Sequence, residues 1–335
     1  MVLIIAEAGV NHNGSIEMAK KLIDAAKEAG ADYVKFQTFK ASELVSAAAP
    51  KAAYQQKDGE SGSQLEMFQK LELSKKDHTE LINYCKQKDI RFLSTAFDLE
   101  SIDLLSEAGM ELFKIPSGEI TNLPYLQKTG GLRKKIILST GMCILPEIKD
   151  AVAVLTGAGT DKNNITVLHC TTDYPAKMQD VNLNAMLTIR DELDIAVGYS
   201  DHTNGIEVAV AAVAMGAQVI EKHFTLDRSL PGPDHKASLE PAELKNMVTA
   251  IRNIELAMGS GAKQPTATEL KNRTAARKSV HLSRSLPAGH ILTAADFVMK
   301  RPGNGISPMQ MEALTGKGIR TALPEDHLLT WEDLQ

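Results

Sequence analysis

The alternation of apolar and polar segments predicts an α/β protein: a (β/α)8 TIM barrel followed by a small β-rich domain. Short apolar runs of strand length alternate with helix-length segments, which is typical of βαβ units and a parallel sheet. Helical patterns end in glycine and pass directly into the next apolar run, as at Gly30, Gly109 and Gly216. Glycine favours this position because it adopts the left-handed conformation that ends a helix.

The predicted strands are eight apolar runs at about residues 2–7, 32–37, 90–95, 111–115, 135–139, 165–169, 194–199 and 217–222. Helical patterns fill the gaps between them, for example at residues 15–29, 99–108, 145–155, 205–215 and 241–258. Eight alternating units predict a closed barrel, with a Rossmann-type sheet as the main alternative. We therefore expect residues 1–260 to form a TIM-barrel catalytic domain.

A second domain is expected after the barrel. Residues 261–278 are polar, with Gly, Pro and Thr early and basic residues later, which indicates a linker. Residues 279–335 contain short strand-like pieces at 279–282, 297–300 and 318–321 among Gly and Pro turns. A domain of this size is short of core, so we expect it to rest on another surface.

The stretch from Lys40 to Lys76 is too long for an ordinary strand-to-helix connection. Its Lys, Gln, Glu and Ser content indicates an exposed segment. It follows the second predicted strand, on the side of a barrel where active sites form. We therefore expect a loop that covers the substrate rather than an inert insertion.

Composition excludes several classes of function. The chain has 37 Lys and Arg against 42 Asp and Glu, a formal charge of −5, so it offers no basic field for nucleic acid or anionic lipid. Cys85, Cys143 and Cys170 are too few for a disulfide framework, and we expect Cys85 and Cys170 to be core residues. With no signal-peptide pattern and no apolar run of membrane-spanning length, we expect a soluble, cytoplasmic protein.

Two histidines, His202 and His223, each close an apolar run that is predicted to be a strand. Side chains at the ends of neighbouring parallel strands converge at one edge of the sheet. Two converging imidazoles suit a divalent metal ion. The alternative is two unrelated histidines that hydrogen-bond to the backbone, and we favour the metal site.

Two lysines, Lys35 and Lys114, lie inside predicted strands, where a purely structural barrel has no use for a charge. Together with the hydroxyls of Ser117, Ser139 and Ser200 they form a candidate phosphate site. Gly118 and Gly141 leave nearby backbone N–H groups accessible to an anion. The alternative is that each lysine reaches the surface or pairs with a carboxylate in the core.

Glu7 and Glu221 are candidates for acid–base catalysis, because a carboxylate on a buried strand end tends to have a perturbed pKa. Either could instead be a counterion, Glu7 for Lys35 and Glu221 for a lysine or a metal-bound imidazole. The rigid loop after the last strand carries Asp234 and His235, and we expect both to face the site.

Eight segments together resemble the sialic acid synthase family: IAEAGVNHNG at 5–14, VKFQT at 34–38, FKIPSGE at 113–119, LSTGM at 138–142, YSDHT at 199–203, EKHFT at 221–225, PGPD at 231–234 and KRPGNGI at 300–306. The resemblance covers essentially the whole chain in order, and the last segment is similar to that family's antifreeze-protein-like (SAF) domain. It implies condensation of phosphoenolpyruvate (PEP) with an N-acylated mannosamine-type sugar by a domain-swapped homodimer.

The resemblance also implies roles for individual residues. The expected PEP ligands are Lys35, Thr95, Lys114, Ser117, Ser139 and Ser200. The expected sugar ligands are Gln37, Phe97, Glu119, Tyr174, Asp234 and, from the second subunit, Arg301. His202 and His223 would bind the metal, with Mn²⁺ the first choice and Mg²⁺ or Co²⁺ as alternatives.

The identity of the sugar is left open by one departure from the family pattern: Thr171 and Thr172 stand where many members have an asparagine. A hydroxyl replaces an amide in one hydrogen bond but not in two. N-acetylmannosamine, leading to N-acetylneuraminate, is the first choice. The alternative is 2,4-diacetamido-2,4,6-trideoxymannose, leading to N,N'-diacetyllegionaminate.

Three further alternatives concern the class of protein. A different metal-dependent aldolase or PEP-condensing enzyme on the same barrel would keep the histidines and lysines but not the C-terminal domain. A Schiff-base aldolase would use Lys35 or Lys114 as a nucleophile. A non-catalytic sugar-binding homologue would tolerate the loss of metal ligands, whereas His202 and His223 are both present.

Overall fold

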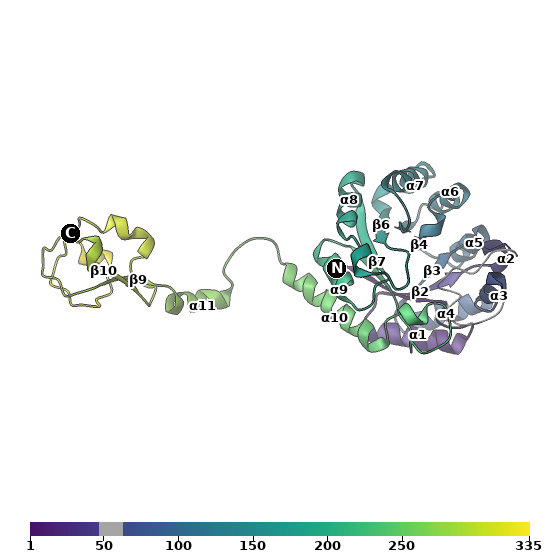
Figure 1. Ribbon diagram of the computed structural model, residues 1–335, viewed down its shortest axis with the longest axis horizontal. Helices are drawn as coiled ribbons and strands as arrows, with labels where there is room; N and C mark the ends of the chain where they lie inside the picture. The colour runs from purple at the N-terminus through teal and green to yellow at the C-terminus, as the bar shows by residue number, and fades with distance from the viewer. Residues whose placement is uncertain (47–62) are drawn as a thin grey trace. The chain divides into compact units, whose positions relative to one another are not determined.

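The computed structural model describes residues 1–46 and 63–335, which divide into two compact units, Met1–Gly259 and Ser260–Gln335. In the first unit eight parallel strands close into a barrel (Figure 1). The strands are β1 (Leu3–Gly9), β2 (Tyr33–Thr38), β3 (Arg91–Ala96), β4 (Leu112–Ile115), β5 (Lys135–Ser139), β6 (Ile165–Cys170), β7 (Ala196–Asp201) and β8 (Val219–His223). The predicted barrel is confirmed, and pairing of β1 with β8 excludes an open Rossmann-type sheet.

Helices surround the strands and follow each of them in turn (Figure 1). They are α1 (Ile16–Ala29), α4 (Lys75–Gln87), α5 (Leu99–Glu107), α6 (Leu123–Gly131), α7 (Leu145–Gly157), α8 (Asn184–Leu193), α9 (Glu207–Ala214) and α10 (Pro241–Met258). The first shows why these segments are helical: the Ser15 side chain caps its N-terminus, and Gly30 ends it at a φ of 85°. Apolar strand and helix faces pack into one continuous core.

The register of the strands brings polar side chains from distant segments to one level of the barrel. Neighbouring residues in a parallel ladder carry side chains on the same face, so paired residues lie side by side. The cross-strand pairs are Glu7–Lys35, Glu7–His223, Gln37–Thr95, Thr95–Lys114 and Ser200–Glu221. This arrangement explains how residues more than two hundred positions apart in the chain can form one site.

The opposite face of β7 and β8 carries a buried ion pair that was not predicted. Because side chains alternate along a strand, Lys222 lies on the other face of β8 from Glu221. Lys222 Nζ lies 2.7 Å from Asp201 Oδ2 and donates to the carbonyl of Thr203 at 2.5 Å. Asp201 Oδ1 accepts from the backbone N–H and the hydroxyl of Thr203. Both charged side chains are completely buried.

The segment predicted to cover the substrate contains two short helices, α2 (Ala41–Leu44) and α3 (Gln64–Gln69). Val10, Phe39 and Leu71 form a small buried cluster beside them, separate from the main core. Residues 47–62 lie outside the described part of the chain. Among the residues that are described, none of the helices has the length and apolar character needed to cross a membrane.

The second unit contains α11 (Ala267–Ala276) and an antiparallel pair, β9 (Ser279–Leu282) and β10 (Phe297–Lys300). The two strands match their predictions, whereas residues 318–321 form only isolated bridges at Gly318 and Ile319. The segment expected to be a linker contains a helix. The expectation that the domain is short of core is wrong, since it has its own cluster of Val280, Leu282, Leu286, Leu292, Ile306, Leu314, Ile319, Leu323, Leu329 and Leu334.

Candidate active site

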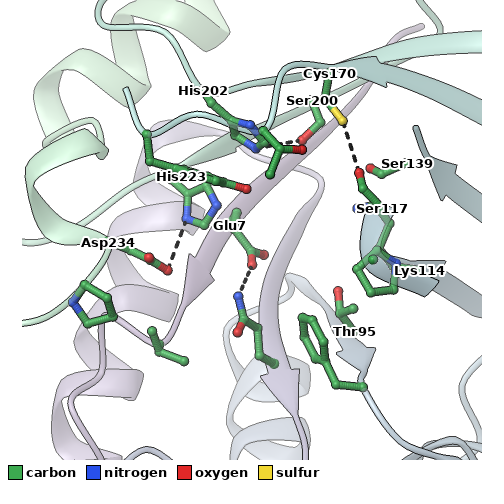
Figure 2. A pocket seen from close by; sticks show the side chains of 18 of the residues that line it. Glu7, Thr95, Lys114, Ser117, Ser139, Cys170, Ser200, His202, His223 and Asp234 are labelled. Carbon is green, nitrogen blue, oxygen red and sulfur yellow. Dashed lines mark hydrogen bonds and ion pairs between the residues drawn. The ribbon is translucent and has the colours of Figure 1, made fainter. Parts of the chain in front are cut away.

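A cavity of about 300 Å³ opens at the carboxyl ends of the barrel strands (Figure 2). This is the end at which TIM-barrel enzymes place their active sites. Most residues predicted for the site line it: Glu7, Lys35, Gln37, Thr95, Phe97, Lys114, Ser117, Ser139, Tyr174, Ser200, His202, Glu221, His223 and Asp234. Residues scattered over the sequence therefore form one lined cavity.

Two lysines and two glutamates form an ion cluster at the base of the cavity. Lys35 Nζ lies 2.9 Å from Glu7 Oε2 and 3.5 Å from Glu221 Oε2. Lys114 Nζ lies 3.2 Å from Glu221 Oε1. All four side chains are at most 5% exposed. The counterion alternatives for Lys35 and Lys114 are thus realised, although both lysines also line the cavity.

The two glutamates have pKa values shifted in opposite directions. Burial raises the pKa of Glu7 to about 7 against the attraction of Lys35, and the neighbouring charge of Glu221 adds to the increase. Burial acts on Glu221 as well, but Lys114 and Lys35 outweigh it and lower its pKa to about 2. At neutral pH Glu221 is therefore an anion, while Glu7 exchanges its proton readily.

Hydroxyl groups surround the two lysines. Lys35 Nζ donates to Thr95 Oγ1 at 2.8 Å, and Ser200 Oγ donates to Glu221 Oε1 at 3.1 Å. Among the described residues, Ser139 Oγ is buried in the cavity wall without a hydrogen-bond partner. A buried hydroxyl without a partner is costly, so an incoming oxyanion at this place would satisfy it.

The loop after β5 is built around Gly141. Its N–H donates to Ser117 Oγ at 2.8 Å, which leaves the hydroxyl proton of Ser117 for another acceptor. A Cβ at this position would lie 2.0 Å from Thr172 Oγ1, so only glycine fits. The hydrogen bond from Gly141 holds Ser117 at the cavity edge, where Ser117 Oγ lies 3.4 Å from Cys170 Sγ.

The two imidazoles lie together on the other side of the cavity from Ser117 and Ser139 (Figure 2). The ring centroids of His202 and His223 are 5.7 Å apart. Burial lowers the pKa of His202, and burial together with the charges of His202 and Lys35 holds the pKa of His223 well below its usual range. Both rings are therefore neutral and carry a lone pair at neutral pH.

The hydrogen bonds of these rings fit a metal-binding role. His202 Nδ1 donates to the carbonyl of Thr171 at 2.7 Å, which leaves the lone pair on Nε2, facing Ser200 Oγ at 3.3 Å. Within the described residues, His223 Nδ1 is buried without a hydrogen bond, and Asp234 Oδ2 lies 3.9 Å from it. Residues 1–46 and 63–335 hold no cluster of three His, Cys, Asp or Glu side chains around such a point. Water and substrate would have to complete the coordination.

Four predicted sugar ligands line the cavity: Gln37, Phe97, Tyr174 and Asp234. Gln37 Nε2 donates to Glu7 Oε1 at 3.4 Å, and the rings of Tyr174 and His202 lie 4.3 Å apart. Burial raises the pKa of Asp234 to about 6. These side chains offer amide, phenol and carboxyl groups around the imidazoles, as a polyhydroxylated substrate requires.

Two predicted sugar ligands are not among the residues that line the cavity. Glu119 accepts a hydrogen bond from Asn122 within its own loop. Arg301 belongs to the second unit, where its Nε donates to the carbonyl of Ala276. The proposed role of Arg301 toward a partner barrel stays a prediction.

Two other expectations need correction. His235 does not line the cavity, because its ring is turned to Thr225 Oγ1 at 2.6 Å and Asn13 Oδ1 at 3.3 Å. Cys170 is buried as expected but also lines the cavity. Of the two threonines, Thr172 lines the cavity while Thr171 donates its hydroxyl to the carbonyl of Asp180.

Residues around α2 and α3 also line the cavity and were not predicted individually: Leu44, Val45, Gln64 and Phe68. Their segment carries no strand or helix periodicity that would have singled them out. They confirm that the long segment after β2 borders the site. Its central residues, 47–62, are not described.

Comparison with known proteins matches residues 22–263 to the NeuB family and residues 277–335 to the SAF domain. N,N'-diacetyllegionaminic acid synthase from Campylobacter jejuni is 56% identical, over 98% of each chain. The protein of the same name from Legionella pneumophila is 49% identical, over 99% of this chain and 94% of its own. The crystal structure of N-acetylneuraminic acid synthetase from Leptospira borgpetersenii is 35% identical, covering 81% of this chain and 90% of its own with a TM-score of 0.72.

Proposed function

The chain belongs to the NeuB family, and we propose that it condenses PEP with 2,4-diacetamido-2,4,6-trideoxymannose to give N,N'-diacetyllegionaminic acid and phosphate. The observation that carries this choice is the identity of 56% and 49% to two synthases named for that product. Identity to the N-acetylneuraminic acid synthetase is lower, at 35%. N-acetylmannosamine, the first choice from the sequence alone, is therefore replaced by the alternative, 2,4-diacetamido-2,4,6-trideoxymannose.

The ion cluster supports binding of PEP, a small trianion at most. Lys114, Ser117 and Ser139 surround one part of the cavity. The Ser139 hydroxyl has no hydrogen-bond partner within residues 1–46 and 63–335, and it suits a phosphate oxygen. Lys35 stands beside Thr95 at 2.8 Å and suits the carboxylate. A barrel gains little stability from four buried charges, since replacement of such pairs by apolar residues is often neutral or favourable. Their retention at a cavity supports a catalytic role.

The proposed reaction forms a bond between C3 of PEP and the aldehyde carbon of the open-chain sugar. Positive charge develops at C2 of PEP, and the aldehyde oxygen takes up a proton to become a hydroxyl. Water adds at C2 with loss of one proton. The tetrahedral intermediate then loses the second proton as its C2 hydroxyl becomes the ketone and phosphate leaves by cleavage of the C–O bond, so the two protons of water end on the new hydroxyl and on phosphate. Lys35 and Lys114 stabilise the anionic groups throughout because they are already oriented by Glu7 and Glu221.

The two glutamates take different roles in this scheme. Glu7, whose pKa burial raises to about 7, accepts the proton of the attacking water. Glu221 stays ionised and fixes both lysines, because their attraction lowers its pKa to about 2 against the effect of burial. Lys35 would be a poor Schiff-base nucleophile, since Glu221 and Glu7 raise its pKa against the effect of burial. Burial lowers the pKa of Lys114, so covalent trapping is the test that decides for that residue.

A divalent cation is part of the proposal, with Mn²⁺ the first choice. His202 and His223 would hold it, and it would supply Lewis-acid polarisation of the aldehyde oxygen. Asp234 lies beside His223 and orients the sugar hydroxyls from the same side. Replacement of either histidine by Ala should leave the fold intact and remove metal-dependent activity.

Phosphate release from PEP tests the proposal, with the product acid identified by mass spectrometry. The enzyme should turn over 2,4-diacetamido-2,4,6-trideoxymannose faster than N-acetylmannosamine, and chelation should stop the reaction until Mn²⁺ is restored. Equal or better turnover of N-acetylmannosamine would return the assignment to N-acetylneuraminate. Borohydride trapping of a covalent adduct on Lys35 or Lys114 would favour a Schiff-base aldolase.

A further inference from the structure

One sector of the cavity presents hydrocarbon instead of polar groups. We call Val10, Leu44, Phe68 and Phe97 the apolar wall. Val10 follows β1, Leu44 and Phe68 belong to α2 and α3, and Phe97 follows β3. The wall therefore occupies the β1–β3 side of the cavity mouth. The imidazoles come from the end of β8 and from the residue after β7, Ser117 lies two residues after β4, and Ser139 ends β5.

The apolar wall is braced from behind. The ring of Phe39, which is 5% exposed, lies 5.3 Å from the ring of Phe68 and 6.3 Å from that of Phe97, edge to face in both cases. Such aromatic pairs fix ring positions. Leu71 completes the buried cluster with Phe39 and Val10. The wall is thus a defined surface and not a chance exposure of single side chains.

The position of the wall relates it to one end of the sugar. The phosphate and the aldehyde have their proposed partners on the β4–β5 and β7–β8 sides. The PEP carboxylate has Lys35 and Thr95, which lie within β2 and β3, whereas Val10 and Phe97 of the wall follow the ends of their strands. The mouth of the cavity on the β1–β3 side is therefore left to the rest of the sugar chain. We propose, on the basis of the function proposed above, that the apolar wall receives the C6 methyl group of a 6-deoxy sugar. The wall then selects 6-deoxy sugars against those with a C6 hydroxyl.

The selectivity follows from hydration. A methyl group placed against the wall leaves water for hydrocarbon, which is favourable. A hydroxyl group placed against these four side chains loses hydrogen bonds to water and gains none from them, because all four are hydrocarbon. The amides of Gln37 and Gln64 line the same side of the cavity. An apolar pocket discriminates against one added hydroxyl by about 10- to 100-fold. We expect a preference of that size in kcat/KM.

The test uses a matched pair of sugars that differ by one oxygen: 2,4-diacetamido-2,4,6-trideoxymannose and 2,4-diacetamido-2,4-dideoxymannose, which retains the C6 hydroxyl. The wild-type enzyme should favour the first about 10- to 100-fold in kcat/KM for phosphate release from PEP. Equal kcat/KM values would overturn the inference while leaving the proposed function standing. Turnover of neither sugar would instead refute the proposed function itself.

Two variants locate the effect in the wall. Val10→Thr keeps the shape of the side chain and replaces a methyl group with a hydroxyl. Leu44→Gln introduces a polar amide at a partly exposed position of a four-residue helix. Each should reduce the preference for the 6-deoxy sugar about tenfold, mainly by lowering its kcat/KM. Leu44→Met is the matched apolar control and should keep the preference.

Two results with these variants would overturn the assignment. An unchanged preference in both Val10→Thr and Leu44→Gln would show that the wall does not contact C6. An equal loss for both sugars would place an acyl methyl group, and not C6, against the wall. Thermal unfolding of each variant separates these outcomes from a failure to fold, and Leu44→Gln remains informative if Val10→Thr does not fold.

Discussion

Adjacent residues of β8 enter two buried ion clusters of different character. Lys222 is completely buried against Asp201, and the pair is hydrogen-bonded to the carbonyl, N–H and hydroxyl of Thr203. On the opposite face, Glu221 joins Lys35 and Lys114 beside a cavity of about 300 Å³. Hydrogen bonding around the second cluster is incomplete: among the described residues, the neighbouring Ser139 hydroxyl has no hydrogen bond.

The difference teaches that burial of a lysine does not by itself indicate function. Lys35, Lys114 and Lys222 are all nearly inaccessible to solvent. What separates them is whether the surrounding polar groups are saturated and whether a space for a ligand adjoins them. A saturated pair holds β7 and β8 in place, whereas an unsaturated cluster beside a cavity is prepared for an anion.

The largest effect is expected from Lys222→Met. It leaves Asp201 buried without a counterion, so the free energy of unfolding of the barrel should fall by about 3–5 kcal/mol, measured by urea unfolding. Turnover per folded molecule should stay near that of wild type. The double variant Lys222→Met with Asp201→Leu should recover most of the stability. If neither variant changed the free energy of unfolding, the Lys222–Asp201 pair would have no structural role.

Lys114→Met should have the opposite profile. Loss of one cation from the phosphate site should lower kcat/KM for PEP by about 100- to 1000-fold. Lys35 still neutralises Glu221, at 3.5 Å, so stability should fall less than in Lys222→Met. Steady-state phosphate release and urea unfolding of the same preparations measure the two quantities. A stability loss as large as that of Lys222→Met, with turnover retained, would make Lys114 structural.

A smaller effect is expected from ligand binding. PEP at ten times its Kd should raise the free energy of unfolding by about 1.4 kcal/mol. For a barrel of this size that corresponds to about 3–6 °C in Tm, read by differential scanning fluorimetry. Lys222→Met should keep this shift relative to its own lower Tm. Lys114→Met should lose most of it, and an equal shift in both variants would contradict the assignment of the anion site.

A further effect concerns pH. Burial raises the pKa of Glu7 to about 7, so between about pH 4.5 and 7 the folded state retains a proton that the unfolded state has released. Stability from this group is present below that window and is lost as pH rises through it, by at most about 1.4 kcal/mol per pH unit. Glu7→Gln should remove this negative slope from urea unfolding measured across the window. An identical slope in the variant would mean that Glu7 ionises normally.

The fold and most of the residues that line the cavity could be predicted because both depend on local features of the sequence. Strand periodicity marks the extent of each strand. Lys35 and Lys114 lie within predicted strands, and His202 and His223 close them. Parallel strands then bring these ends together whatever the details of packing. The choice of sugar could not be made this way, since it depended on comparison with known synthases.

Other features depend on tertiary geometry that the sequence does not display. The pairing of Lys222 with Asp201 follows from the register of β7 and β8. Both residues stand next to predicted site residues in the sequence, which gave no sign that their side chains point away from the cavity. The ring of His235 turns to Thr225 through a turn of its own loop. Phe68 reaches the cavity from a segment without periodicity. In each case the decisive partner lies in another element or is reached through irregular backbone.

Closure of the barrel also determines when, during synthesis, the site becomes complete. Glu7 on β1 is paired with His223 on β8, so the first strand to leave the ribosome and the last strand of the barrel share the site. At about 5–20 residues per second, the interval between them is tens of seconds. During that interval the nascent chain lacks Glu221 and His223 and has no complete anion site. The polar groups of the cavity are therefore complete only once β8 has docked against β1.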